Sequence, residues 1–192
     1  MTAAEIALAI KKGDKQHKPV LIAIGGYGGS GKTTVANKLK EILGSAYIVG
    51  TDDFIIKERL TLVSPNMECY DLKRLENQVL APTVQNKEIK YQILDWASNK
   101  LGEPVHVPNI DYLIIEGITA YFPSIAKYYD YKIWVDTPIE VAKLRGKQKD
   151  AGSENEQHWD LWSKNDVSYQ QKYHPEQQAD FVFNNTNDDK QS

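Results

Sequence analysis

The part of the sequence with the clearest chemical meaning is a glycine-rich segment, Gly26-Tyr27-Gly28-Gly29-Ser30-Gly31-Lys32-Thr33. It fits the pattern G-x-x-x-x-G-K-[ST], in which glycines let several backbone N–H groups converge on one phosphate. Lys32 can then reach the β- and γ-phosphates of a nucleoside triphosphate, and the Thr33 hydroxyl is placed to ligate Mg²⁺. The predicted ATP-binding residues are Gly26, Gly28, Gly29, Ser30, Gly31, Lys32, Thr33 and Thr34.

The sequence around this loop supports the same interpretation. An apolar run over Val20 to Ile24 predicts a buried strand before it, and apolar residues at helical spacing over Thr33 to Leu43 predict a helix after it. The alternative is a glycine-rich turn that precedes Lys-Thr by chance. Such a turn has no reason to lie between a buried strand and an amphipathic helix, so this context favours a phosphate loop. The guanine-reading pattern N-K-x-D is missing, since Asn99-Lys100-Leu101-Gly102 lacks the aspartate. We therefore favour ATP over GTP.

Acidic residues follow two other predicted strands. Asp52 and Asp53 come after the strand expected over Ala46 to Val49, and Glu116 ends the strand expected over Tyr112 to Ile115. Open α/β sheets bind ligands at the carboxyl ends of their strands, which is where these acids would lie. Glu116 is then placed to hold a metal-bound water opposite the phosphate loop. The alternatives are a turn or helix cap for the aspartates and a surface acid for Glu116.

The remaining pattern predicts an α/β protein, a three-layer α/β/α sandwich around a mainly parallel sheet of five strands. Further strands are expected over Tyr131 to Val135 and Phe181 to Phe183. Helices are expected over Thr2 to Lys12, Asp71 to Leu80, Pro138 to Gly146 and Trp159 to Lys172. We expect one domain over 1–192, with an N-terminal helix in 1–18, a hairpin or excursion beside the substrate over 86–108, a lid over 145–158 and a polar tail over 186–192.

Composition excludes several classes of protein. The 192 residues carry 23 basic and 26 acidic side chains, a net charge of −3, which argues against binding nucleic acid through bulk charge. A single cysteine, Cys69, excludes an internal disulfide and a zinc site of several cysteines. The apolar runs are too short to span a membrane, and the N-terminus is unlike a signal peptide. We expect a cytoplasmic protein without membrane or nucleic-acid partners; a homo-oligomer is left open.

Several motifs occur in an ordered set: GGYGGSGKTT, TDDF, YDLKRL, LIIEGITAYFP and KIWVDTP followed by a basic helix. This set resembles the uridine kinase and phosphoribulokinase family of P-loop kinases over about Val20 to Asn185. Within that family it is most similar to uridine-cytidine kinases and nicotinamide riboside kinases. The glycine loop alone is generic, whereas the order of the other motifs is more specific.

The resemblance implies roles for individual residues. Asp52 matches the general base that accepts the proton of a ribose 5′-hydroxyl, with Lys32 and Arg145 as the other catalytic groups. Asp53 would join Thr33 and Glu116 in holding Mg²⁺. Asp71, beside Tyr70, is similar to the carboxylate that binds the ribose 2′- and 3′-hydroxyls, although it could also cap the following helix.

Two departures from the family pattern leave the acceptor open. Leu94-Asp95-Trp96 stands where uracil-reading members have Tyr-Asp-Phe, and Ser98 or Asn99 stands where a histidine should follow. Trp96 could stack on a base or could simply pack. The predicted lid offers Arg145, Lys147 and Lys149 where uridine kinases have several arginines, and lysine is the weaker positional clamp.

The sequence and the resemblance thus predict an ATP- and Mg²⁺-dependent kinase with a small nucleoside-like acceptor, and the favoured acceptor group is the 5′-hydroxyl of a ribonucleoside of the uridine or cytidine type. The expected substrate-binding residues are Asp52, Tyr70, Asp71 and Trp96. A kinase for nicotinamide riboside, pantothenate, a sugar or a sugar phosphate is the first alternative. A non-catalytic ATP-binding regulatory protein is the second, because fold does not fix function.

Overall fold

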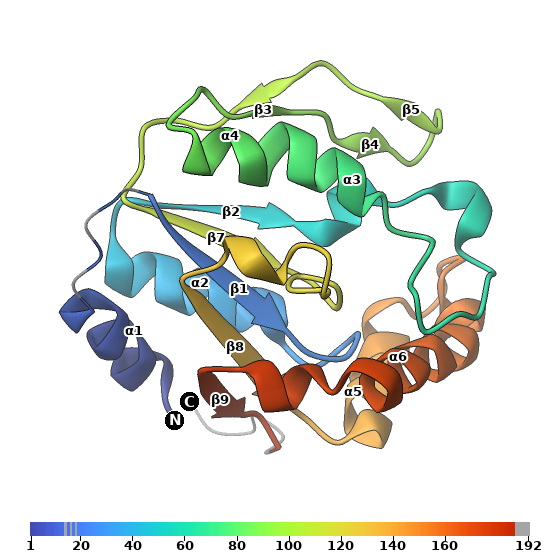
Figure 1. Cartoon of the computed structure of the whole chain (residues 1–192). Helices are drawn as coiled ribbons and strands as arrows, with labels where there is room; N and C mark the ends of the chain where they lie inside the picture. The colour runs from blue at the N-terminus through green and yellow to red at the C-terminus, as the bar shows by residue number, and fades with distance from the viewer. Residues whose placement is uncertain (14, 16, 18, 187–192) are drawn as a thin grey trace.

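A computed structural model describes residues 1–13, 15, 17 and 19–186 of the chain. The predicted polar tail lies outside the described residues from position 187 onward. Five parallel strands form the central sheet in the order β2-β7-β1-β8-β9 (Figure 1). The strands are β1 (Val20–Gly25), β2 (Ala46–Gly50), β7 (Tyr112–Glu116), β8 (Tyr131–Asp136) and β9 (Phe181–Asn184).

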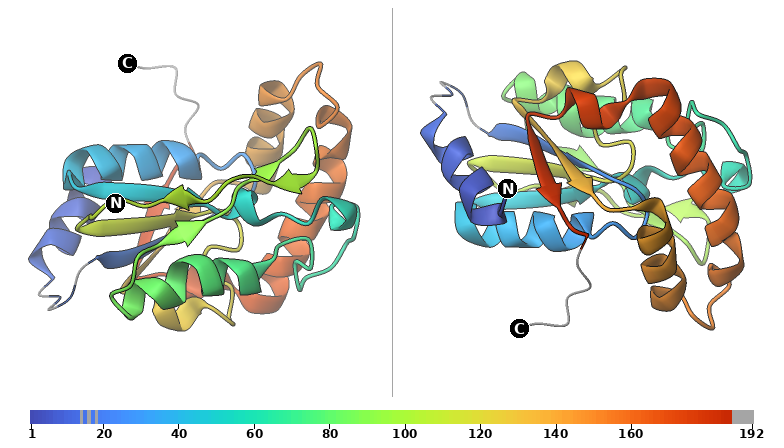
Figure 2. Two further views of the ribbon diagram at one scale, coloured as in Figure 1. Left: turned by 90° about the horizontal axis from the view of Figure 1, so that it is seen from above. Right: turned by 90° about the horizontal axis from the view of Figure 1, so that it is seen from below.

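The strands are buried on both faces because alternate side chains enter two different cores. Ile22 and Ile114 face a core shared with helices α1 (Ala3–Lys12) and α2 (Lys32–Leu43). Leu21 and Leu113 face the opposite core. Its helical cover is a continuous helical segment made of α3 (Leu72–Leu75), the π-helix η3 (Glu76–Leu80) and α4 (Ala81–Val84). The predicted three-layer sandwich is confirmed, as the views in Figure 2 show.

One expected helix end is wrong. The helix predicted to stop at Leu80 continues to Val84, past Pro82. Proline lacks the N–H that a regular α-helix would use and normally ends or kinks the helix. Here the wide turn of η3 directly precedes it and shifts the hydrogen-bond register, so the chain continues helically through the proline.

Residues 86–108 leave the sheet as an extended antiparallel arm. Its first rung pairs β3 (Lys90–Tyr91) with β6 (Val105–His106), and its second pairs β4 (Leu94–Asp95) with β5 (Lys100–Leu101). In Figure 1 the arm runs above α3 and α4.

The carboxyl end of the sheet is covered by two helices, α5 (Ile139–Lys149) and α6 (Trp159–Tyr173). They lie together beside the ends of the central strands (Figures 1 and 2). The short 3-10 helices are η1 (Thr51–Phe54), η2 (Lys57–Arg59), η4 (Ala126–Tyr128), η5 (Glu156–His158) and η6 (Pro175–Gln178). No helix in the described part of the chain is long and apolar enough to cross a membrane.

Register in the sheet fixes where the strands end. Ile24 of β1 and Gly50 of β2 both pair with Glu116 of β7, so all three residues share one rung. The glycine loop after β1 and the acids after β2 therefore begin level with Glu116.

Candidate active site

The glycine-rich loop connects β1 to α2 and is pressed against α5. Gly29 has φ +77° and Gly31 has φ +93°, conformations that favour glycine. A Cβ on Gly29 would overlap the carbonyl oxygen of Ala142 in α5. The loop ends at Lys32, the first residue of α2, so the positive end of that helix faces the loop. This is the geometry of a phosphate-binding loop.

Two side chains of α2 project from the loop toward the strand ends. The Lys32 Nζ donates to the carbonyl of Tyr27 within the loop, at 2.9 Å. The Thr33 hydroxyl donates to Glu116 Oε1 at 3.0 Å, which joins the phosphate loop to the end of β7. Burial raises the pKa of Glu116, and the nearby Lys32 opposes that rise.

A hydroxyl and a carboxylate already in contact fit Mg²⁺, which keeps several waters and takes few protein ligands besides substrate phosphates. Thr33 and Glu116 would hold the ion. No cluster of three or more His, Cys, Asp or Glu side chains suited to a metal occurs among the described residues. A site of this kind is completed by the nucleotide.

Asp52 lies on η1, directly after β2, and lines the same cavity as the phosphate loop. The Tyr70 hydroxyl donates to Asp52 Oδ1 at 3.5 Å, and an antiparallel bridge between Ile55 and Tyr70 holds the two segments together. Asp53 does not line the cavity. Its pKa is raised to about 6 by burial and by Asp52, against the opposing charge of Arg74.

Asp71 is engaged in the structure of the helix that it begins. Its Oδ1 accepts from the backbone N–H of Arg74 at 2.9 Å, and its Oδ2 lies 3.6 Å from the Arg74 guanidinium. The capping role is therefore present. Asp71 is not part of the cavity lining, whereas Trp96, on the arm, is part of it and is 41% exposed.

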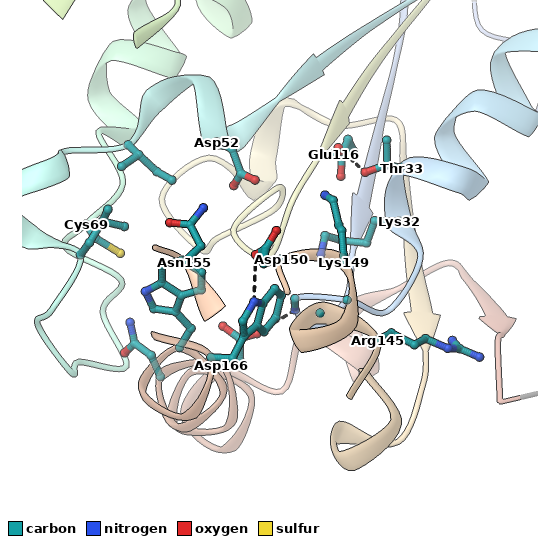
Figure 3. Close-up of a pocket in the computed structure, with 18 of the residues that line it drawn as sticks. Lys32, Thr33, Asp52, Cys69, Glu116, Arg145, Lys149, Asp150, Asn155 and Asp166 are labelled. Atoms are coloured by element: carbon teal, nitrogen blue, oxygen red, sulfur yellow. Dashed lines mark hydrogen bonds between the residues drawn. The ribbon is translucent and has the colours of Figure 1, made fainter. Parts of the chain in front are cut away.

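The predicted lid cations point in different directions. Arg145 donates through Nη1 to the carbonyl of Asn185 at 3.2 Å, and Figure 3 shows its side chain directed away from Lys32 and Glu116. Lys147 forms an ion pair with Asp160 of α6 at 3.1 Å. Lys149 extends toward the centre of the cavity in the same view.

The segment predicted as a lid packs against a tryptophan. The Trp159 ring packs on Gly146, where a Cβ would overlap it, and its Nε1 donates to Asp150 at 2.9 Å. The same ring lies close to Gly28 of the phosphate loop. The start of α6 thus contacts both α5 and the loop.

Four residues of α6 that we did not predict as site residues line the cavity: Trp159, Trp162, Asn165 and Asp166. Asp166 is buried and its Oδ2 accepts from the Gly28 N–H at 2.7 Å. The Trp162 Nε1 is buried without a hydrogen-bond partner among the described residues. The spacing of Trp159, Trp162 and Asp166 places them on one face of a helix. From the sequence alone such a stripe is interpreted as a packing face, so it does not indicate a ligand site.

We expect Asp166 to give the protein a measurable pH dependence. Burial raises its pKa from 3.8 to about 6, although the Gly28 N–H and Lys32 oppose the rise. The folded protein thus binds this proton more tightly than the unfolded chain, and the charged carboxylate lowers stability above pH 6. The gain in unfolding free energy on Asp166→Asn should be about 1–3 kcal/mol larger at pH 7.5 than at pH 4.5.

Urea unfolding of both proteins at the two pH values measures this difference. The control is Asp160→Asn on the same helix, where Lys143 and Lys147 lower the pKa of the carboxyl. That variant should be destabilised at pH 7.5, the opposite sign. An Asp166→Asn effect that is equal at both pH values would contradict the prediction.

Taken together, the loop, Glu116, Asp52 and α6 enclose a cavity of about 580 Å³. That volume lies in the range of small-molecule sites. In Figure 3, Lys32 and Thr33 lie on one side of this space, Asp52 above it and Asp166 below it. The cavity thus has a phosphate end and a second end beyond Asp52.

The sequence is similar to known kinases and to one family profile. The Zeta toxin family profile matches residues 4–58, the segment that contains the phosphate loop. A uridine kinase from Limosilactobacillus reuteri is 31% identical over 144 residues, covering 69% of this chain and 66% of the relative. A uridine kinase from Lactobacillus helveticus is 28% identical over 148 residues, 71% and 70% of the two chains. The chain belongs to the uridine kinase-like P-loop kinases.

Solved structures agree on the fold of this P-loop kinase. The structure described as a possible uridine kinase from Bacillus stearothermophilus has a TM-score of 0.72 and 20% identity, covering 94% of this chain and 96% of that one. A D-glycerate 3-kinase from Cryptococcus neoformans has a TM-score of 0.58 and 16% identity, covering 87% and 85%. The predicted family and fold class are both confirmed.

Proposed function

We propose that this P-loop kinase uses ATP with Mg²⁺ to phosphorylate the 5′-hydroxyl of a ribonucleoside. The observation that carries the proposal is the cavity itself. It joins the phosphate loop, the Thr33–Glu116 pair and Asp52 in one space large enough for a small acceptor. The uridine kinases among the relatives support a nucleoside as the acceptor.

In this mechanism the chain acts by positioning and by charge. The loop N–H groups and Lys32 bind the β- and γ-phosphates, for which Lys32 exchanges its contact with the Tyr27 carbonyl. Asp52 accepts the proton of the attacking hydroxyl. Thr33 and Glu116 hold Mg²⁺, which when bound neutralises charge on the phosphates.

The other predicted site residues take supporting roles in the proposal. Tyr70 orients Asp52 through its hydroxyl. Asp53 acts on the metal only through water, since it lies outside the cavity lining. Trp96 closes the acceptor end. Arg145 reaches the transferring phosphoryl group only if α5 moves and its contact with Asn185 is exchanged.

Acceptor-dependent release of ADP over a panel of acceptors tests the proposal. The panel contains ribonucleosides, their 2′-deoxy forms, nicotinamide riboside, pantothenate and pentoses. We expect turnover with a ribonucleoside and its loss on chelation of Mg²⁺. Poorer use of the 2′-deoxy form would indicate that Asp71 binds the ribose diol.

Two other outcomes would contradict the proposed nucleoside kinase activity. Turnover with pantothenate or a free sugar alone would replace the nucleoside by another acceptor. ATP binding without turnover on any member of the panel would favour a regulatory ATP-binding protein.

A further inference from the structure

The acceptor end of the cavity has an unusual distribution of charge. Beyond Asp52 its walls are largely apolar and aromatic, including Met67, Cys69 and Trp162. Two carboxylates face this end, Asp52 from η1 and Asp166 from α6, and Figure 3 shows them on opposite sides of the space. Burial raises the pKa of the Cys69 thiol to about 11, and the negative charges of Asp166 and Asp52 add to the rise.

The positive charges come from other elements than the carboxylates, and one of them, Lys149, extends toward the centre of the cavity. Among the described residues that line the cavity, the cations are Lys32, Arg145 and Lys149, all from the phosphate loop and α5. Lys32 contacts the loop carbonyl and Arg145 contacts Asn185. The polar groups that the described part of α6 adds to the acceptor end, besides Asp166, are neutral: the Trp162 N–H and the Asn165 amide.

An anionic acceptor would therefore enter a space that two carboxylates, Asp52 and Asp166, face from opposite sides. Like charges brought together in a desolvated site repel strongly, and a wrong partner is rejected in this way. A neutral or cationic acceptor meets no such repulsion. A positively charged ring would also be attracted by the carboxylates and by the face of Trp162.

We propose that Asp166 is a specificity-determining residue that excludes acceptors carrying a carboxylate or phosphate and admits neutral or cationic ones. The inference rests on the proposed kinase function of the same site. Asp166 is suited to this role because its contact with the Gly28 N–H fixes its carboxylate beside the place where the γ-phosphate and the acceptor must meet. Asp52 is not assigned this specificity role, because in the proposed mechanism its carboxylate accepts the proton of the attacking hydroxyl.

A purely structural role for Asp166 makes a different prediction. If Asp166 only anchors the loop to α6, its replacement should affect all acceptors by the same factor. Asparagine keeps an oxygen that can accept from the Gly28 N–H and removes only the charge. Asp166→Asn thus separates the two roles.

The test uses two pairs of ribonucleosides whose members differ only in a carboxamide or a carboxylate on the base. One pair is the 5-carboxamide and 5-carboxylate of uridine, and the other is the ribosides of nicotinamide and nicotinic acid. For the wild type we expect kcat/KM for the carboxamide member to exceed that for the carboxylate member by about 30-fold or more. In Asp166→Asn the ratio should fall below about fivefold, mainly through a lower KM for the carboxylate.

The matched control is Asp150→Asn, which removes a carboxylate of the same cavity that is bound to the Trp159 N–H. Its ratio should stay at the wild-type value. Asp166→Lys, if it folds, should reverse the preference. An unchanged ratio in Asp166→Asn, or a wild type that prefers the carboxylates, would overturn the inference while leaving the kinase function intact. If ADP release depends on none of the four nucleosides, the proposed function fails first, and the inference with it.

Discussion

Asp52→Asn should lower kcat of the acceptor-dependent reaction by about a thousandfold while the affinity for ATP changes less than about threefold. Asparagine has nearly the shape of aspartate but cannot take up the proton of the attacking hydroxyl. Asp52 belongs to η1 rather than to the phosphate loop, so the nucleotide contacts remain. Steady-state ADP release with a ribonucleoside and calorimetric binding of an unreactive ATP analogue measure the two effects.

The companion variant is Tyr70→Phe, which removes the hydroxyl that contacts Asp52 at 3.5 Å. It should reduce kcat by less than about tenfold, because it disturbs the orientation of Asp52 and leaves the carboxylate in place. Turnover of Asp52→Asn within tenfold of the wild type would show that another group accepts the proton.

Gly29→Ala should abolish measurable ATP binding, with a loss in affinity of about a hundredfold or more, and should lower the melting temperature. The added methyl group would overlap the carbonyl of Ala142, a backbone atom that cannot rotate away. Either the loop leaves its phosphate-binding conformation or α5 leaves the loop. Calorimetry with ATP and a thermal unfolding scan measure both consequences.

Gly152→Ala separates this overlap from simple backbone strain. Gly152 has φ +78°, close to the +77° of Gly29, and apart from its chain neighbours no described residue has an atom within 4 Å of the position its Cβ would take. It should lose about 1–2 kcal/mol of stability, from the left-handed conformation alone, and should keep its affinity for ATP. Equal losses in the two variants would mean that contact with α5 is irrelevant to the loop.

The phosphate end of the site could be predicted from the sequence because its chemistry is local. Lys32 and Thr33 belong to a contiguous motif, and the rule that ligands bind at the carboxyl ends of parallel strands placed Asp52 and Glu116 beside them. These residues need only the strand and helix boundaries to be roughly right. The structure brings all four into one cavity.

The acceptor end could not be predicted in the same way, because it depends on how α6 packs. Asp166 contacts Gly28, 138 positions earlier in the chain, and no local pattern relates the two. The direction of Arg145 depends on Asn185, which follows the last strand. Asp71 could be predicted both as a ligand and as a helix cap, and only the position of Arg74 shows that the capping contact is made.

The shared rung of Ile24, Gly50 and Glu116 also bears on how such enzymes can change. Adjacent strands are about 4.8 Å apart, so backbone pairing, and not side-chain choice, sets the separation between the glycine-rich loop and Asp52, the group that we propose accepts the proton. Substitutions in α6 or in the arm can therefore alter which acceptor is used without altering the distance over which the phosphoryl group moves. In an ancestor with this sheet, a new substrate would require changes only in the peripheral elements, and the chemistry would be inherited unchanged.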